Sequence, residues 1–412
     1  MNSPNEPHIR RPAERGQTLL MFVLFMLVLF LFVGLGIDIG FAYITKANLS
    51  KAVDAACLTG MRNLSLGTVT ASAMADSTFH ANYGTPGRDV GTITPSITFG
   101  FDPNNNRTLD VSATATINTF FIRVLPSWKT LQVSADAQST RSKLIMSLVL
   151  DRSGSMNDNG GASALPGAVI GFVNNFDDVN DRVSMSSFSY AASTDVALAQ
   201  PFKAPITTAV NNLVFNGWTA SQQGLTNGLV QNLSYSPAVS AGTTESVVRV
   251  MIFFTDGLAN TFLYTFNCGA RNIAPDRSLY DPNTGAAASG GCTIPSSIPS
   301  VSPPPATVST TSGCSPLTIE AQKRALAVAR LAQQQGVIVF SIGLGDGSGP
   351  TECGFPPLNQ AFLYQVANDP NPANPAYDSS LPSGEAVFAP TASELADVFN
   401  QIASKILLRL TR

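Results

Sequence analysis

The stretch Leu148-Val149-Leu150-Asp151-Arg152-Ser153-Gly154-Ser155-Met156 joins an apolar run to a carboxylate and two hydroxyls at alternate positions. Apolar residues that continue without alternation are typical of a buried strand in a parallel sheet. Open α/β sheets bind their ligands beyond the carboxyl ends of such strands. Oxygen donors at this position suit a hard divalent cation such as Mg²⁺, which keeps some of its waters. The stretch therefore predicts both an α/β fold and a cation site.

From residue 144 onward, patterns typical of strands and helices alternate, which predicts a doubly wound, mostly parallel sheet. The predicted strands cover residues 144–150, 182–188, 248–255, 337–343 and 386–389. The predicted helices include residues 167–176, 221–233, 319–335 and 392–408. A stretch rich in Ser, Pro and Gly separates two of these elements at about 261–316, and it predicts an irregular excursion on the surface.

Two further polar positions follow predicted strands. The stretch Met251-Ile252-Phe253-Phe254-Thr255-Asp256 is a second apolar strand that ends in a carboxylate, and Thr219 offers a hydroxyl just before the predicted helix 221–233. Taken one at a time, such residues also cap helix N-termini, so each has a purely structural explanation. Taken together, they make a set of candidate metal ligands: Asp151, Ser153, Ser155, Thr219 and Asp256.

This set resembles the metal-ion-dependent adhesion site of von Willebrand factor A domains, where Asp-x-Ser-x-Ser is followed by Thr and then Asp in later loops. The resemblance implies a Rossmann-like A domain in which Ser153 and Ser155 bind the metal directly. It implies that Asp151 and Asp256 act largely through waters, and that Thr219 binds directly or through water. Bound Mg²⁺, or Mn²⁺ or Ca²⁺, would leave one position for an Asp or Glu carboxylate of a partner protein. The alternative is a motif retained without metal.

An apolar segment precedes this domain at residues 18–38, and no charged residue occurs from Gln17 to Ile37. About 20 apolar residues are enough to span a hydrocarbon core as a helix. Arg10, Arg11 and Arg15 precede the segment, so the positive-inside rule places the N-terminus in the cytoplasm. The segment exceeds a usual signal-peptide core and no Ala-x-Ala site follows it, which favours a single-pass anchor. Everything after Asp38 is then expected outside the cytoplasmic membrane.

Helical spacing continues over residues 41–60, so we expect the anchor to continue as one long helix, with another helix over 72–82. Residues 92–99, 109–118 and 131–139 alternate and are rich in β-branched side chains, which predicts a small antiparallel sheet. A long apolar helix followed by such a sheet is pilin-like in outline. The predicted organisation is a cytoplasmic tail (1–17), a transmembrane helix (18–38), a helix extension with a β-rich region (39–142) and the A domain (143–412), with the insertion at about 261–316.

A second resemblance concerns the N-terminal part. Arg15-Gly16-Gln17, the apolar run, Asp38-Ile39-Gly40 and Val53-Asp54-Ala55-Ala56 are similar to the start of TadG-like proteins of the Tad/Flp pilus apparatus. In that family a TadE/TadG-type anchor precedes a von Willebrand A domain. Met21 stands where type IV prepilins usually carry Glu, so we expect an uncleaved anchor. The resemblance implies an inner-membrane protein with a periplasmic domain and with pilus or secretion components as partners.

Composition argues against other classes of function. A formal net charge of −3 provides no basic surface for nucleic acid. The two histidines, His8 and His80, follow no strand-end nucleophile, so we predict no catalytic residues and no enzyme. The expected function is pilus assembly or surface adhesion through a metal-bridged carboxylate. The alternative is a purely structural envelope component with a vestigial metal site.

The cysteines fit an exported domain. Cys268, Cys292, Cys314 and Cys353 form an even set outside the expected membrane, which predicts two disulfides in any of three pairings. Cys57 lies on the predicted helix extension, where we expect a small packed residue or, alternatively, an intermolecular bridge.

Overall fold

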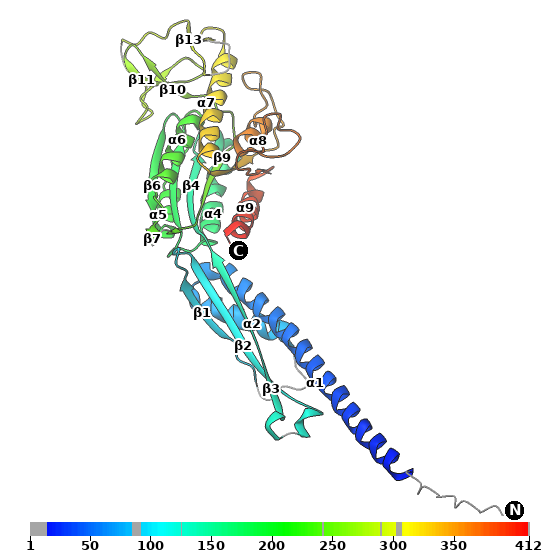
Figure 1. The fold of residues 1–412 in the computed structure, drawn as a ribbon. Helices are drawn as coiled ribbons and strands as arrows, with labels where there is room; N and C mark the ends of the chain where they lie inside the picture. The colour runs from blue at the N-terminus through cyan, green and yellow to red at the C-terminus, as the bar shows by residue number, and fades with distance from the viewer. Residues whose placement is uncertain are drawn as a thin grey trace, which may run out of the picture. The chain divides into compact units, whose positions relative to one another are not determined.

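The computed structural model describes residues 15–84, 92–124, 126–240, 243–288, 291–301 and 307–410. The chain divides into two compact units (Figure 1). The first comprises residues 1–60, 72–98 and 109–138, and the second comprises residues 61–71, 99–108 and 139–412. Most of the predicted cytoplasmic tail, with His8, Arg10 and Arg11, lies outside the described residues.

Helix α1 (Arg15–Arg62) runs through the apolar segment without interruption for 48 residues. Side chains 19–33 are all exposed, and the most apolar window of the helix has a mean hydropathy of 3.0. By length and composition α1 is therefore able to cross a membrane. The prediction that the apolar segment continues as one long helix is confirmed.

The rest of the first unit includes most of a three-stranded sheet, of which residues 99–108 and 139–141 are counted in the second unit. The strands of this sheet are β1 (Ser96–Phe101), β2 (Arg107–Asn118) and β3 (Thr130–Arg141), in the order β1-β2-β3. Helix α2 (Thr68–Tyr83) precedes them. The short 3₁₀ helices η2 (Ile122–Val124) and η3 (Pro126–Trp128) connect β2 to β3, whereas η1 (Leu64–Leu66), which follows α1 in the chain, belongs to the second unit. Buried and exposed residues alternate along β2, as the sequence predicted for a strand with one covered face. Cys57 is buried, with its thiol 3.1 Å from the carbonyl oxygen of Leu109.

The second unit contains a six-stranded sheet with the order β16-β15-β9-β4-β5-β6. All neighbouring strands are parallel except β5 and β6. Their bounds are β4 (Lys143–Asp151), β5 (Arg182–Phe188), β6 (Ala192–Ala199), β9 (Val247–Thr255), β15 (Ile338–Leu344) and β16 (Ala386–Ala389). The predicted α/β fold with a mostly parallel sheet is confirmed. The sequence analysis missed β6, because this edge strand is only partly buried and lacks a continuous apolar run.

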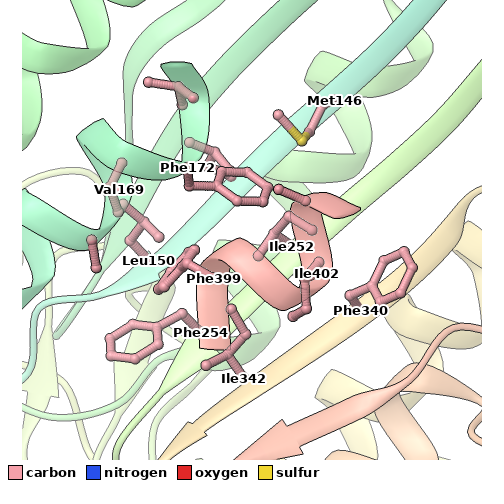
Figure 2. Close-up of a cluster of buried hydrophobic side chains, with 14 of the residues drawn as sticks. Met146, Leu150, Val169, Phe172, Ile252, Phe254, Phe340, Ile342, Phe399 and Ile402 are labelled. Atoms are coloured by element: carbon pink, nitrogen blue, oxygen red, sulfur yellow. The ribbon is translucent and has the colours of Figure 1, made fainter. Parts of the chain in front are cut away.

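Helices cover both faces of this sheet. Met146 and Leu150 of β4 face the same side as Phe254 of β9, where they pack with Phe172 and Phe399 (Figure 2). The helices on this side are α4 (Gly161–Asn174), α5 (Lys203–Asn211) and α9 (Leu395–Leu410), with η4 (Ala392–Glu394) before α9. The opposite face packs against α6 (Ser221–Leu233), α7 (Cys314–Gln334) and α8 (Gln360–Ala367). Burial on both faces explains why the apolar residues of β4 and β9 continue without alternation as far as the strand ends.

The segment at about 261–316 is more regular than its composition indicated. It forms the antiparallel strands β10 (Phe262–Phe266), β11 (Gly269–Ile273) and β12 (Leu279–Tyr280), and the hairpin β13 (Ser297–Pro299) with β14 (Thr307–Ser309). The prediction of an irregular excursion is wrong, because Phe262, Ile273 and Ile298 are fully buried and anchor these strands. Disulfides join Cys268 to Cys292 and Cys314 to Cys353, which selects one of the three pairings.

Candidate metal site

The two central strands bring the predicted carboxylates to one edge of the sheet. Strands β4 and β9 are parallel neighbours, with Leu150 opposite Phe254. Asp151 is the last residue of β4 and Asp256 directly follows β9, so both lie at the carboxyl end of the sheet. Ser155 begins the short helix α3 (Ser155–Asp158) just beyond β4. This is the edge at which open α/β sheets bind ligands.

The serine hydroxyls and Asp256 form a tight cluster. The Ser155 hydroxyl donates to Asp256 Oδ1 at 2.9 Å, and the Ser153 hydroxyl lies 3.5 Å from the same oxygen. The two hydroxyl oxygens are 3.2 Å apart. Residues more than 100 positions apart in the chain are thus within direct hydrogen-bonding distance, as the motif required.

Asp151 is buried beside the cluster and holds its backbone in place through hydrogen bonds. Its side chain is completely buried. Its Oδ1 accepts the backbone N–H of Ser153 at 2.8 Å, and its Oδ2 accepts the Thr255 hydroxyl at 2.5 Å. Asp151 therefore fixes the turn that carries the two serines and ties that turn to the end of β9.

Thr219 reaches the same site from a third loop. It lines one cavity together with Ser155 and Asp256, and its N–H donates to Asn260 Oδ1 at 2.8 Å. Within the described residues, no hydrogen bond joins the Thr219 side chain to the other four candidate ligands. A backbone bond of 3.0 Å from Gly154 N–H to the Gly217 carbonyl holds this loop against the first. Gly217 has φ +81°, and a Cβ there would lie 2.3 Å from the Tyr190 ring, so only glycine fits.

Three residues that the sequence analysis missed complete the polar network. Asn159 Nδ2 donates to Asp256 Oδ2 at 2.7 Å, Thr255 bonds Asp151, and Asn260 positions Thr219. Thr255 precedes Asp256 directly, so its place at the strand end was a usable signal. Asn159 and Asn260 lie in loops whose side-chain directions depend on tertiary packing, and no sequence pattern singled them out.

Burial makes the negative charge of both carboxylates costly. It raises the pKa of Asp151 to about 7, with repulsion from Asp256 as the second cause. Burial also raises the pKa of Asp256, against the hydrogen bonds from Ser155 and Asn159. Among the described residues, no Lys, Arg or His lies within 4.0 Å of either carboxylate as an ion-pair partner. The site therefore favours the approach of positive charge.

The cluster opens into a polar cavity of about 690 Å³. Ser155, Thr219 and Asp256 line its base, and the side chains around them include Trp218 and Glu352. Glu352 pairs with Phe355 in a small bridge next to the Cys314–Cys353 disulfide, which holds this wall in place. The cavity is large enough for a carboxylate side chain of another protein.

The donor set fits a hard divalent cation. In the described part of the chain, no group of three or more His, Cys, Asp or Glu side chains has metal-binding geometry, so a cation here would depend on the hydroxyls. Two carboxylates and the hydroxyls of Ser153, Ser155 and Thr219 provide only oxygen donors, which suits Mg²⁺, Mn²⁺ or Ca²⁺ better than softer metals. A cation would also relieve the repulsion between Asp151 and Asp256.

Comparison with known families identifies both parts of the chain. Residues 146–266, which include all five candidate ligands, match the von Willebrand factor type A domain. The chain carries a von Willebrand factor A domain. Residues 16–63, which form nearly all of α1, match the Flp pilus-assembly TadE/G-like family. The protein is thus a Tad pilus-related A-domain protein. Comparison with curated proteins gives no match.

Solved A-domain structures are similar only at low identity. The PilB minor pilin of Streptococcus sanguinis is 14% identical, with a TM-score of 0.42, and the match covers 77% of this chain and 79% of that one. The domain of the type V pili tip protein Mfa5 from Porphyromonas gingivalis is 15% identical, with a TM-score of 0.41 and coverages of 66% and 97%. Proximal thread matrix protein 1 of the mussel byssus is 14% identical, with a TM-score of 0.38, and the match covers 66% of this chain and 47% of that protein. A second structure of the mussel protein has a zinc-occupied MIDAS motif.

Proposed function

We propose that the protein is an inner-membrane component of a Tad/Flp-type pilus system whose A domain binds a partner protein through a divalent cation. Asp151, Ser153, Ser155, Thr219 and Asp256 would hold the cation, directly or through waters. The bound cation would supply an electrophilic centre for an Asp or Glu carboxylate of the partner. The partner would be a pilus or secretion component, or a surface to which the pilus attaches.

One observation carries this proposal. Two buried carboxylates, Asp151 and Asp256, lie at the end of adjacent strands without an ion-pair partner among the described residues. Burying such charges without compensation costs several kcal/mol. A cation would offset this cost, and the cavity above Ser155 and Thr219 would give a ligand access to it.

We propose binding and not catalysis for this site. The cavity lining contains hydroxyls, carboxylates and amides but no histidine, lysine or cysteine among its described residues. The hydroxyls of Ser153 and Ser155 bond Asp256 and each other, and no His or Lys among the described lining residues is available as their general base. The residues present can orient a carboxylate and neutralise its charge.

The N-terminal helix supports the proposed location. The side chains of residues 19–33 are exposed and apolar, as expected for a segment surrounded by lipid. Arg15 precedes this segment, and by the positive-inside rule this supports a periplasmic location for the A domain. Protease accessibility of the A domain in spheroplasts tests this orientation, and a domain protected by the intact membrane would contradict it.

Calorimetric titration of Mg²⁺, Mn²⁺ and Ca²⁺ into the full chain in detergent tests the cation site. We expect one saturable site, which Asp151→Ala abolishes. Asp397→Ala is the matched control, because Asp397 is an exposed carboxylate on α9 of the same domain. Equal binding by wild type and Asp151→Ala would overturn the cation proposal.

A chromosomal Asp151→Ala, Ser153→Ala strain separates the cation-dependent role from the structural alternative. We expect loss of piliation or of attachment with normal amounts of the protein in the membrane. Normal piliation and attachment would favour a structural component whose metal site is vestigial. The Asp397→Ala strain again serves as the control.

A further inference from the structure

The end of the first unit's sheet carries exposed apolar side chains. Between β2 and β3, Phe120 and Phe121 are about half exposed, Trp128 is 49% exposed and Val124 is 81% exposed. We call these four side chains the tip surface. In a water-soluble region such a group is costly, because each side chain loses the free energy of burial. The tip surface therefore indicates a contact with an apolar partner.

The backbone of the tip is fixed to α1. Asp38 is only 2% exposed, and its Oδ1 accepts the N–H of Phe120 at 2.8 Å. Its Oδ2 accepts the N–H groups of Phe121 and Ile122, both at 2.9 Å. A Cβ at Gly34 would lie 2.5 Å from Phe121 Cβ, so the tip also approaches the helix too closely for a larger residue. The position of the tip along α1 is thus defined.

This position lies beside the apolar part of α1. Trp128 and Ile122 line an apolar cavity of about 360 Å³ together with residues of α1, namely Val28, Leu31, Phe32 and Leu35. Ten residues separate Val28 from Asp38, which is about 15 Å along a helix. An apolar run of about 20 residues spans roughly 30 Å, so its C-terminal half corresponds to one leaflet. The tip therefore lies at the depth of the outer leaflet.

The polar groups of the tip suit the membrane interface. Backbone N–H groups that leave water need partners, and Asp38 provides them for three consecutive residues. The Thr119 hydroxyl bonds the carbonyl of Trp128 at 2.6 Å. Arg123 and Lys129 are exposed next to the tip surface, where long cationic side chains can reach lipid phosphates. Tryptophan is enriched at this depth in membrane proteins.

We propose that the tip surface is seated in the outer leaflet of the membrane, with Phe120, Phe121, Val124 and Trp128 among the acyl chains and Arg123 and Lys129 at anionic headgroups. The occupant of the cavity between α1 and Trp128 is then a lipid acyl chain. The inference rests on the proposed anchoring by α1 and is independent of the cation site. It gives the first unit a second attachment to the bilayer, which restricts how α1 rotates and tilts.

Lipid quenching of a single tryptophan tests the inference. The chain has two tryptophans, so Trp218→Phe leaves Trp128 as the only one, and Trp128→Phe leaves Trp218 in the A domain as the control. Both variants are placed as full chains in nanodiscs of phosphatidylcholine and phosphatidylglycerol, with or without acyl-brominated phosphatidylcholine. We expect several-fold stronger quenching by brominated lipid, and several-fold weaker quenching by iodide, for Trp128 than for Trp218.

The possible results of the quenching experiment separate failure of this inference from failure of the proposed anchor. A chain that elutes with the discs while Trp128 is quenched by iodide and not by brominated lipid overturns the inference and leaves the anchor intact. A Trp128 protected from both quenchers indicates a protein contact, such as a second copy, and also overturns it. A chain that does not enter the discs overturns the anchor and this inference together.

A pair of aspartate variants tests the attachment of the tip to α1. Asp38→Ala removes the acceptor of the three backbone N–H groups, so we expect weaker quenching of Trp128 by brominated lipid. Asp54→Ala is the matched control, because Asp54 is exposed on the same helix. Equal quenching in the two variants would contradict the role of Asp38 in holding the tip at this depth.

Discussion

Replacing Asp151 by Asn should stabilise the cation-free protein at alkaline pH and remove most of its response to Mg²⁺. Asn keeps both hydrogen bonds of Asp151, because its carbonyl oxygen can accept from Ser153 N–H and its amide can donate to the Thr255 hydroxyl. The substitution therefore removes mainly the buried charge. No cavity forms, because Asp and Asn have nearly the same volume.

The magnitude follows from the pKa of the buried carboxyl. Burial and Asp256 raise the pKa of Asp151 from 3.8 to about 7, and a pKa difference of one corresponds to about 1.4 kcal/mol. Ionised Asp151 thus costs the cation-free fold on the order of 4 kcal/mol. Between the two pKa values the folded state holds a proton that the unfolded chain has lost. The stability of the wild type therefore falls as pH rises from about 4 through about 7.

Urea denaturation in a Trp128→Phe background measures this effect, with Trp218 fluorescence reporting on the A domain. In EDTA at pH 8 we expect Asp151→Asn to unfold at higher urea than wild type, with the difference reduced at pH 5. Excess Mg²⁺ should stabilise the wild type at pH 8 and have little effect on the variant. The stability of the variant still depends to some extent on pH, because burial also raises the pKa of Asp256. The same pH dependence in wild type and variant, with Asp397→Asn as control, would refute the reasoning.

Three other substitutions or treatments test the fold of the second unit. Arg141→Met should lower the free energy of unfolding by about 3–5 kcal/mol in urea, because it leaves Asp181 buried without the guanidinium that bonds both its oxygens at 2.8 and 2.6 Å. Gly228→Ala should lower it by about 1–3 kcal/mol and reduce the Tm, because a Cβ there would lie 2.4 Å from a side-chain carbon of β4. Reduction of the Cys314–Cys353 disulfide should speed hydrogen exchange in the loop after β15 without changing cation affinity, because the candidate ligands lie on other loops. Unchanged hydrogen exchange in this loop, or a lower affinity for the cation, would contradict the proposed role of the disulfide.

The sequence by itself determined the central parallel strands of the sheet and the long apolar helix α1. The apolar runs that end at Asp151 and Asp256 have a strand's length and no alternation, and a parallel sheet buried on both faces requires such runs. The uninterrupted apolar run within α1 likewise predicts a helix long enough to cross a membrane. These patterns are local, so they can be recognised in the sequence without knowledge of the fold.

Only the tertiary structure decided which side chains meet. Three hydrogen bonds join residues about 80 to 100 positions apart in the chain. They link Ser155 to Asp256, Asn159 to Asp256, and Asp38 to the N–H of Phe120 in the β2–β3 connection. Such contacts depend on strand order and loop packing, which no short sequence pattern encodes. The order of the central sheet places β4 beside β9, and this neighbourhood turns two separate strand ends into one candidate site.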